Sequence, residues 1–304
     1  MKFWVGVTDK NWFEYLRARQ PDEVNFWQPS SRALAAFLEP GVPFLFKLHS
    51  PDDYVVGGGF FVGFSALPAR LAWEAFLDKN GVTDYASLKR RIEQYRGEPL
   101  RGDPEIGCNI LNAPFFFDEK DWIPVPPDWA RNIVRGKTYD TVDSAGLRLW
   151  NQVEGRLQAL PDLVLQAQAA ARYGAEYLSR ARLGQGAFRI LVTEAYHRKC
   201  AVTGERTLPV LEASHIRPYA EQGPHVVSNG LLLRSDIHTL YDDGYLTVTD
   251  DLRIEVSRKI KEEFQNGREY YAYHGKPLGE LPSLADQRPS GDFLRWHNEH
   301  RYLG

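Results

Sequence analysis

Residues 211–242 read LEASHIRPYAEQGPHVVSNGLLLRSDIHTLYD, and this stretch decides the fold of the C-terminal part of the chain. An apolar, strand-like run ends at His215, and a second run begins after Asn229. His238 follows in the first turn of a short helix, for which we expect Ser235 to be the N-cap. A strand pair with this helix folded across it would bring the two histidines and the asparagine together.

With these residues, the stretch resembles the HNH nuclease superfamily, whose ββα-metal fold holds a His, an Asn and a His around one divalent ion. The resemblance covers roughly residues 184–257. The Gly184-Gln185 pair and the Cys-x-x-Thr-Gly sequence of residues 200–204 resemble the subgroup found in predicted restriction endonucleases. The resemblance therefore implies an endonuclease that hydrolyses phosphodiester bonds in double-stranded DNA.

The resemblance also implies a role for each of the three polar residues. His215 would be the general base, because an imidazole near its ordinary pKa can take a proton from water at neutral pH. Asn229 would hold the base or its loop in position through the side-chain amide. His238 would ligate one divalent ion, Mg²⁺, Mn²⁺ or Ni²⁺, which bridges the scissile phosphate and stabilises the leaving 3′ oxygen.

The sequence departs from the common family pattern at the metal ligands. Many members carry an aspartate immediately before the first histidine, where this chain has Ser214. Asp236 is our candidate for the missing carboxylate, although neighbours two residues apart on a helix do not share a face. Many members also bind a structural zinc through two CxxC pairs. Here Thr203, Arg234 and Ile237 occupy three of those four positions, so we expect no structural zinc.

The length and the sequence pattern predict an α+β protein of two domains. A chain of 304 residues is too long to fold around a single hydrophobic core and is usually divided into domains. The expected domains are a DNA-reading domain at 1–139, a helical linker at 140–183, and the nuclease domain with a C-terminal extension at 184–304. Apolar runs predict strands at 3–7, 43–46 and 55–56. Helical spacing is typical of the following segments: 11–19, 71–79, 85–95, 144–178, 187–197 and 291–300.

The N-terminal half resembles PUA-like domains of the EVE and YTH type, which implies a β-barrel-like fold with helices. Such domains flip a modified base into an aromatic pocket, where stacking and edge hydrogen bonds test its identity. A modification-dependent restriction enzyme that reads methylated or hydroxymethylated cytosine is the resulting hypothesis. For each candidate aromatic residue, a place in the core is the alternative. The candidate base-binding residues are Trp12, Asn25, Phe26, Trp27 and Trp73.

Charge and cysteine content narrow the class of protein. The net charge of −3 argues against non-specific coating of nucleic acid, although basic residues outnumber acidic ones just before the HNH-like stretch. Arg198, Arg217 and Arg234 could contact phosphates, with a solvated surface role as the alternative. Two cysteines cannot form a disulfide framework, and we expect Cys200 to be a small buried residue. Without a signal sequence or a long apolar run, a cytoplasmic protein is expected.

Other functions remain open at this point. An HNH enzyme could cut or nick unmodified DNA, a protein with a decayed metal site at Ser214 could bind DNA without cleaving it, and a PUA-like half could bind RNA. Double-strand cleavage with one active site per chain needs two copies, so a homodimer is expected at least during cleavage.

Overall fold

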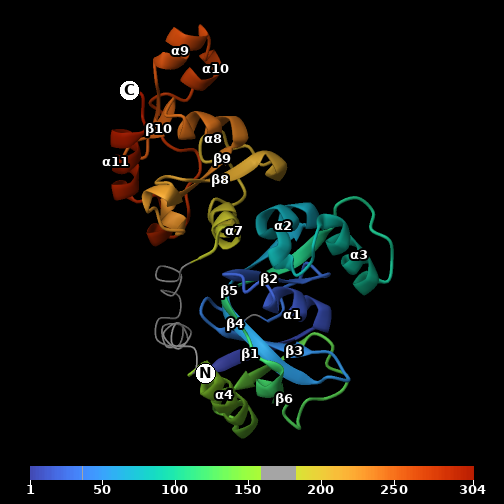
Figure 1. Cartoon of the computed structure of the whole chain (residues 1–304). Coiled ribbons are helices and arrows are strands. Elements are labelled where there is room, and N and C mark those ends of the chain that lie inside the picture. Colours follow the sequence, from blue (N-terminus) through green and yellow to red (C-terminus); the bar gives the residue numbers. More distant parts are fainter. Residues whose placement is uncertain (36, 159–182) are drawn as a thin grey trace. The chain divides into compact units, whose positions relative to one another are not determined.

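A computed structural model of the chain describes residues 1–35, 37–158 and 183–304. These residues fold into two units, Met1–Ala187 and Phe188–Gly304 (Figure 1). Both units contain helices and strands, which confirms the α+β prediction. In the described part of the chain, no helix is long and apolar enough to cross a membrane.

The first unit is built on a seven-stranded sheet in the order β2-β5-β4-β3-β1-β7, with β6 paired to β4. β1 and β3 run parallel, and every other pair is antiparallel. We expected a barrel-like domain, but β2 and β7 are the two ends of an open sheet and do not pair with each other. The strands are β1 (Lys2–Thr8), β2 (Glu23–Gln28), β3 (Pro43–Leu48), β4 (Tyr54–Pro68), β5 (Glu105–Phe116), β6 (Ile123–Pro124) and β7 (Gly136–Asp140).

Helices pack on both faces of this sheet. Phe3 and Val5 of β1 share one apolar cluster with Leu149 of α4, whereas Trp4 belongs to the opposite cluster, which includes Phe13 of α1. This separation follows from the alternation of side chains along a strand. The helices are α1 (Lys10–Arg17), α2 (Ala69–Phe76), α3 (Tyr85–Arg96) and α4 (Ser144–Leu157), with 3₁₀ turns η1 (Leu77–Asn80) and η2 (Glu119–Asp121).

Strands and helices are observed at the predicted places of this unit, most with bounds that differ by a few residues, but the strand predicted at 55–56 extends over the 15 residues of β4. Asp9 and Asp84 begin α1 and α3, because each carboxylate accepts a hydrogen bond from a backbone N–H of the first turn. The expected linker helix at 144–178 is observed as α4 only for its first part. Its remainder from residue 159 to 178 lies outside the described residues.

The second unit contains the predicted strand pair and helix. β8 and β9 are antiparallel, with His215 opposite Gly230, and α8 follows β9 directly. The N-cap prediction was wrong: Ser235 is the first helical residue, and Arg234 precedes it without a side-chain cap. The elements are α7 (Gln185–Ala195, from Phe188 on in this unit), β8 (Leu211–His215), β9 (Gly230–Arg234), α8 (Ser235–Asp242), β10 (Leu246–Val248), β11 (Ile254–Val256), α9 (Lys259–Phe264), α10 (Arg268–Tyr271), α11 (Gly291–His300), and the 3₁₀ turns η4 (Leu208–Val210), η5 (Tyr219–Glu221), η6 (Val227–Asn229) and η7 (Ala285–Gln287).

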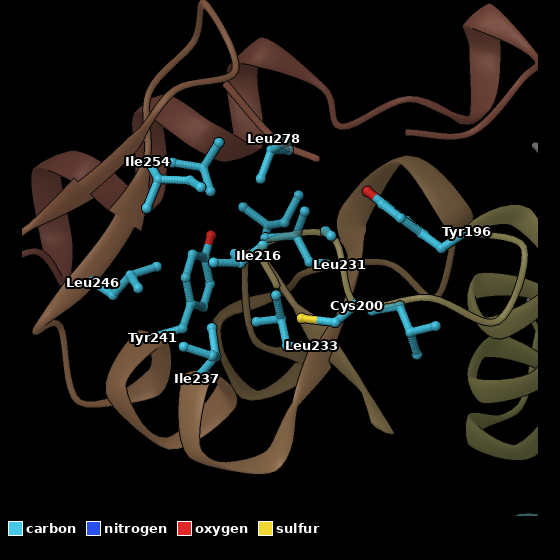
Figure 2. Packing of buried hydrophobic residues seen from close by; sticks show 14 of the residues in the cluster. Tyr196, Cys200, Ile216, Leu231, Leu233, Ile237, Tyr241, Leu246, Ile254 and Leu278 are labelled. Carbon is cyan, nitrogen blue, oxygen red and sulfur yellow. The ribbon is translucent and has the colours of Figure 1, made fainter. Parts of the chain in front are cut away.

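One apolar core holds these short elements together. Figure 2 shows side chains of β9, α8, β10 and β11 pointing into this core, with Tyr241 among them. The ring of His297 from α11 stacks on Tyr241 at 3.8 Å between ring centroids. Its two nitrogens are hydrogen bonded to the backbone oxygen of Tyr241 and to the hydroxyl of Thr247. Burial lowers the pKa of His297 to about 4, so this histidine is a neutral core residue at pH 7.

Candidate active site

His215 stands at the end of β8 inside a group of aromatic rings. Its imidazole lies nearly parallel to the ring of Phe188, with 3.8 Å between the ring centroids. Its Nε2 is hydrogen bonded to Nδ1 of His225 at 3.0 Å. Within the described residues, no hydrogen bond reaches Nδ1 of His215. One nitrogen of the ring is therefore fixed by a side chain, and the other is available to a substrate or to water.

Burial lowers the pKa of His215 to about 4; repulsion from His225 or His238, when either is protonated, acts in the same direction, whereas Asp242 opposes it. A histidine with so low a pKa is neutral at pH 7 and has a lone pair that can accept a proton, but it is a weaker base than the imidazole near its ordinary pKa that we expected.

Asn229 is fully buried and holds the chain between β8 and β9. Its Oδ1 accepts a hydrogen bond from the backbone N–H of Arg217, and its Nδ2 donates to the backbone oxygens of Arg217 and Pro224, all at 2.9 Å. The amide therefore fastens both ends of the loop that carries His225. Losing the amide would remove the hydrogen-bond partner of three backbone groups in this loop.

His238 lies on α8 between two carboxylates. Its Nδ1 is 2.5 Å from a carboxylate oxygen of Glu212, and its Nε2 is 3.2 Å from one of Asp242, one helical turn further on. Burial lowers the pKa of His238, but the hydrogen bonds to Asp242 and Glu212 outweigh burial, so the pKa is raised above its ordinary value. The structure thus gives His238 acidic neighbours and His215 an environment that disfavours charge.

Asp236, our candidate metal ligand, has a different partner. Both of its carboxylate oxygens bind the guanidinium of Arg234, at 2.6 and 2.7 Å. Arg234 also forms an ion pair with Glu269 at 3.3 Å. The carboxylates in contact with His238 are those of Glu212 and Asp242, so the structure does not bring Asp236 to this histidine.

The other two arginines named as phosphate contacts also have partners within the chain. Arg198 forms an ion pair with Glu194 at 2.7 Å. Arg217 donates to the backbone oxygen of Glu221 and lies over the ring of Trp296, 5.5 Å from its centroid. A DNA phosphate would have to compete with these contacts.

The residues around His238 suit a divalent ion in their chemistry, because one imidazole and two carboxylates are common ligands of Mn²⁺, Mg²⁺ and Ni²⁺. They are not arranged as a complete metal site. Among residues 1–35, 37–158 and 183–304, no three His, Cys, Asp or Glu side chains are placed to share one ion. Cys200 is fully buried, as predicted, and its sulfur accepts hydrogen bonds from the backbone N–H groups of Thr203 and Arg234.

The first unit contains a cavity of about 360 Å³, within the usual range for small-molecule sites. Three of the five candidate base-binding residues line it: Trp12, Phe26 and Trp27. Tyr95 completes an aromatic wall, because its ring meets that of Trp27 edge-on at 5.9 Å. The polar residues of the lining include Thr8, Asp9, Gln28, His49 and Arg135.

The other two candidates do not line this cavity. Asn25 is fully buried, and its Nδ2 donates a hydrogen bond to Oδ1 of Asn80 at 2.9 Å, so its amide is bonded inside the unit. Trp73 is a half-buried residue of α2 away from the lining. Trp12 and Phe26 themselves are mostly buried, and the edge-on contact of their rings at 5.4 Å makes them both core residues and cavity wall. Trp27 is the more accessible of the two tryptophans in the lining.

Sequence reasoning missed three residues that the structure brings to the site. Asp242 could have been found, because it lies four residues after His238 on the same helical face. Glu212 and His225 could not, because their contacts with His238 and His215 depend on how β8, its loop and α8 pack in space.

The sequence around this site matches a known family of nucleases. Residues 200–249 match a family model described as HNH endonuclease, and the matched stretch includes β8, β9 and α8. The comparison with curated proteins found no match. Among solved structures, the chain is similar to one titled "Modification dependent TagI restriction endonuclease", with 15% identity and a TM-score of 0.29 over 93% of this chain and 76% of that chain. The predicted resemblance to HNH nucleases is therefore confirmed for residues 200–249, whereas no comparison bears on the PUA-like resemblance of the N-terminal half.

Proposed function

We propose that this protein is a metal-dependent DNA endonuclease in which His215 is the general base, and that its first unit selects DNA containing a modified cytosine. The observation that carries the nuclease chemistry is a neutral imidazole with one nitrogen fixed and the other available. The observation that carries the reading of a base is the aromatic cavity of the first unit.

The hydrolytic step follows from these positions. His215 takes a proton from water, the water oxygen attacks phosphorus, and the bond from phosphorus to the 3′ oxygen breaks. The leaving 3′ oxygen takes up a proton from solvent, which balances the reaction. The imidazolium that forms on His215 is disfavoured by burial, whereas the negative charge of the phosphodiester stabilises it.

His238 and Asp242 are the residues that would hold the divalent ion, with Glu212 beside them. A bound ion would polarise the phosphate and stabilise the developing charge on the leaving oxygen. The two side chains lie one turn apart on α8, so they project from the same face of the helix. Asp236 is left out of the proposed set because both of its carboxylate oxygens are hydrogen bonded to Arg234.

This assignment predicts which carboxylate controls metal affinity. We expect Asp242→Asn to weaken Mn²⁺ binding by at least about tenfold. Loss of a residue that only hydrogen bonds a metal ligand already lowers metal affinity by about that factor. Asp236→Asn is the matched control, because it makes the same change two residues before His238, and its affinity should stay at the wild-type value. Binding is measured without DNA by calorimetry and by the electron paramagnetic resonance signal of free Mn²⁺. Equal affinities for Asp242→Asn and wild type would contradict the assignment.

A base extruded from the duplex would stack on the aromatic wall formed by Trp27 and Tyr95. Extrusion costs a few kcal/mol, which stacking and hydrogen bonds in the cavity must offset. Reading of a base by the first unit would complement the HNH domain, because contacts to the backbone position a protein on DNA without specifying sequence.

Digestion of a panel of DNAs tests both parts of the proposal. Duplexes that are unmodified or carry 5-methylcytosine, 5-hydroxymethylcytosine or 6-methyladenine are incubated with Mg²⁺, Mn²⁺ or Ni²⁺, and with EDTA. We expect cleavage only with a divalent ion and preferentially of DNA containing a modified cytosine. Equal cleavage of all four DNAs would contradict the proposed recognition of a modified base but would support the proposed nuclease activity. No cleavage with any ion would overturn the nuclease proposal for the intact chain.

The number of copies that act on one DNA is a separate question. One active site per chain makes one cut, so we propose that two copies act together at a double-strand break. Sedimentation of the protein with and without DNA measures the number of copies bound. If the protein stays a monomer under conditions in which it cuts both strands, the proposal of two copies is contradicted.

A further inference from the structure

We propose that His225 is a positioning residue that fixes the tautomer of His215 through the hydrogen bond between their rings. The inference rests on the proposed function of His215 as the general base. It concerns a residue outside the three that define the HNH motif.

The contact is built from both sides. Nε2 of His215 and Nδ1 of His225 are 3.0 Å apart, and the two rings meet at 67° with 4.9 Å between their centroids. The ring of Tyr219 stacks on that of His225, with 4.6 Å between the ring centroids, in the same way as Phe188 stacks on His215. Each imidazole is thus held flat against an aromatic ring, which limits rotation of both.

The loop that carries His225 is also fixed. Asn229 donates to the backbone oxygen of Pro224, the residue immediately before His225, at 2.9 Å. The same amide exchanges two hydrogen bonds with the backbone of Arg217, two residues after His215. The Asn of the motif therefore ties together the two segments from which the paired histidines project. Through this arrangement the buried amide of Asn229 would affect catalysis by holding the two histidines in place, without contacting the substrate.

A neutral imidazole carries one proton, and its position decides which nitrogen can act as a base. When Nδ1 of His225 accepts a hydrogen bond, the proton of His215 is held on Nε2. The lone pair on Nδ1 of His215 is then available to take the proton of the attacking water. After the transfer His215 carries protons on both nitrogens, and its bond to His225 becomes charge-assisted and stronger. A partner of this kind acts on a catalytic histidine by orientation and tautomer choice.

The tautomer is measured directly by ¹⁵N NMR of histidine-labelled protein at pH 7 without metal or DNA, with the His215 signals assigned from a His215→Gln sample. We expect the Nε2–H form in the wild type and a mixture of both forms in His225→Leu, which has no acceptor. His225→Gln, whose amide oxygen can accept, should recover the Nε2–H form in part. His300→Leu is the control, because this exposed histidine on α11 is remote from the pair in sequence and contacts Trp296.

Kinetics provide the second readout. We expect His225→Leu to lower kcat by about 10- to 100-fold, as is typical of residues that orient a site histidine. KM for DNA should not change, and His225→Gln should recover part of the loss. If His225→Leu keeps both the wild-type tautomer and the wild-type kcat, the proposal is overturned. If the tautomer changes as expected while the wild type cleaves no DNA, the positioning of His215 stands and the proposed nuclease function fails.

Discussion

Replacing His215 by alanine is expected to lower kcat for DNA cleavage by about 100- to 10,000-fold, the usual contribution of a general base. Because the pKa of His215 is about 4, nearly every molecule of the wild type has the neutral base at pH 7. The variant would have to rely on water alone as the proton acceptor. Single-turnover cleavage with excess protein measures the chemical step without product release.

The controls separate chemistry from folding. His215 stacks on Phe188, so alanine also removes a packing contact, whereas His215→Gln keeps most of the volume and cannot act as a base. Both variants should bind DNA as the wild type does, and His300→Ala, which removes an exposed imidazole in the same unit, should cleave normally. Wild-type cleavage rates in both His215 variants would rule out this residue as the base.

The sequence predicted the local structure around this histidine well, because that structure depends on short-range pattern. The apolar runs on either side of the loop became β8 and β9, and the helix at 291–300 was predicted with its observed bounds. In each case the alternation or helical spacing of apolar residues is set within a few positions of the chain. The start of α8 shows the limit of this approach, since the expected cap Ser235 is instead the first helical residue.

The carboxylates near His238 show what helical spacing alone can predict. Asp236 is the candidate nearest to His238 in the sequence, but a separation of two residues places side chains on different faces of a helix. Asp242, at a separation of four, is the one that contacts His238. Asp236 instead satisfies Arg234, and no spacing rule within the helix indicates that pair.

Contacts between distant segments could not be predicted from one sequence. His225 carries no pattern that separates it from a solvated loop histidine, and its contact with His215 exists because Asn229 closes the loop. In the first unit, five candidates were chosen by residue type, and the structure sends Asn25 into the interior and leaves Trp73 on α2. Which aromatic side chains surround a cavity depends on the register and twist of the sheet, which chain-local patterns do not encode.

Replacing Trp27 by alanine is expected to weaken binding to duplexes containing a modified cytosine by about 10- to 100-fold, because stacking contributes roughly 1–3 kcal/mol per base. Trp27 lines the cavity, and its Nε1 donates to the backbone oxygen of Asn80 at 3.0 Å, which fixes the plane of the indole. Affinity for unmodified duplexes should not change, since it depends on contacts with the backbone. Fluorescence anisotropy in EDTA measures binding without cleavage.

Trp73→Ala is the matched control for this experiment, because it removes an indole of similar burial from the same unit but away from the cavity. It should bind modified and unmodified duplexes as the wild type does. Trp27→Phe keeps an aromatic face without the bond to Asn80, so it should lose less affinity than alanine does. The ratio of affinities for modified and unmodified DNA is therefore the decisive quantity. If Trp27→Ala leaves this ratio unchanged while the protein remains folded, the cavity does not read the base, and selectivity must arise elsewhere in the chain.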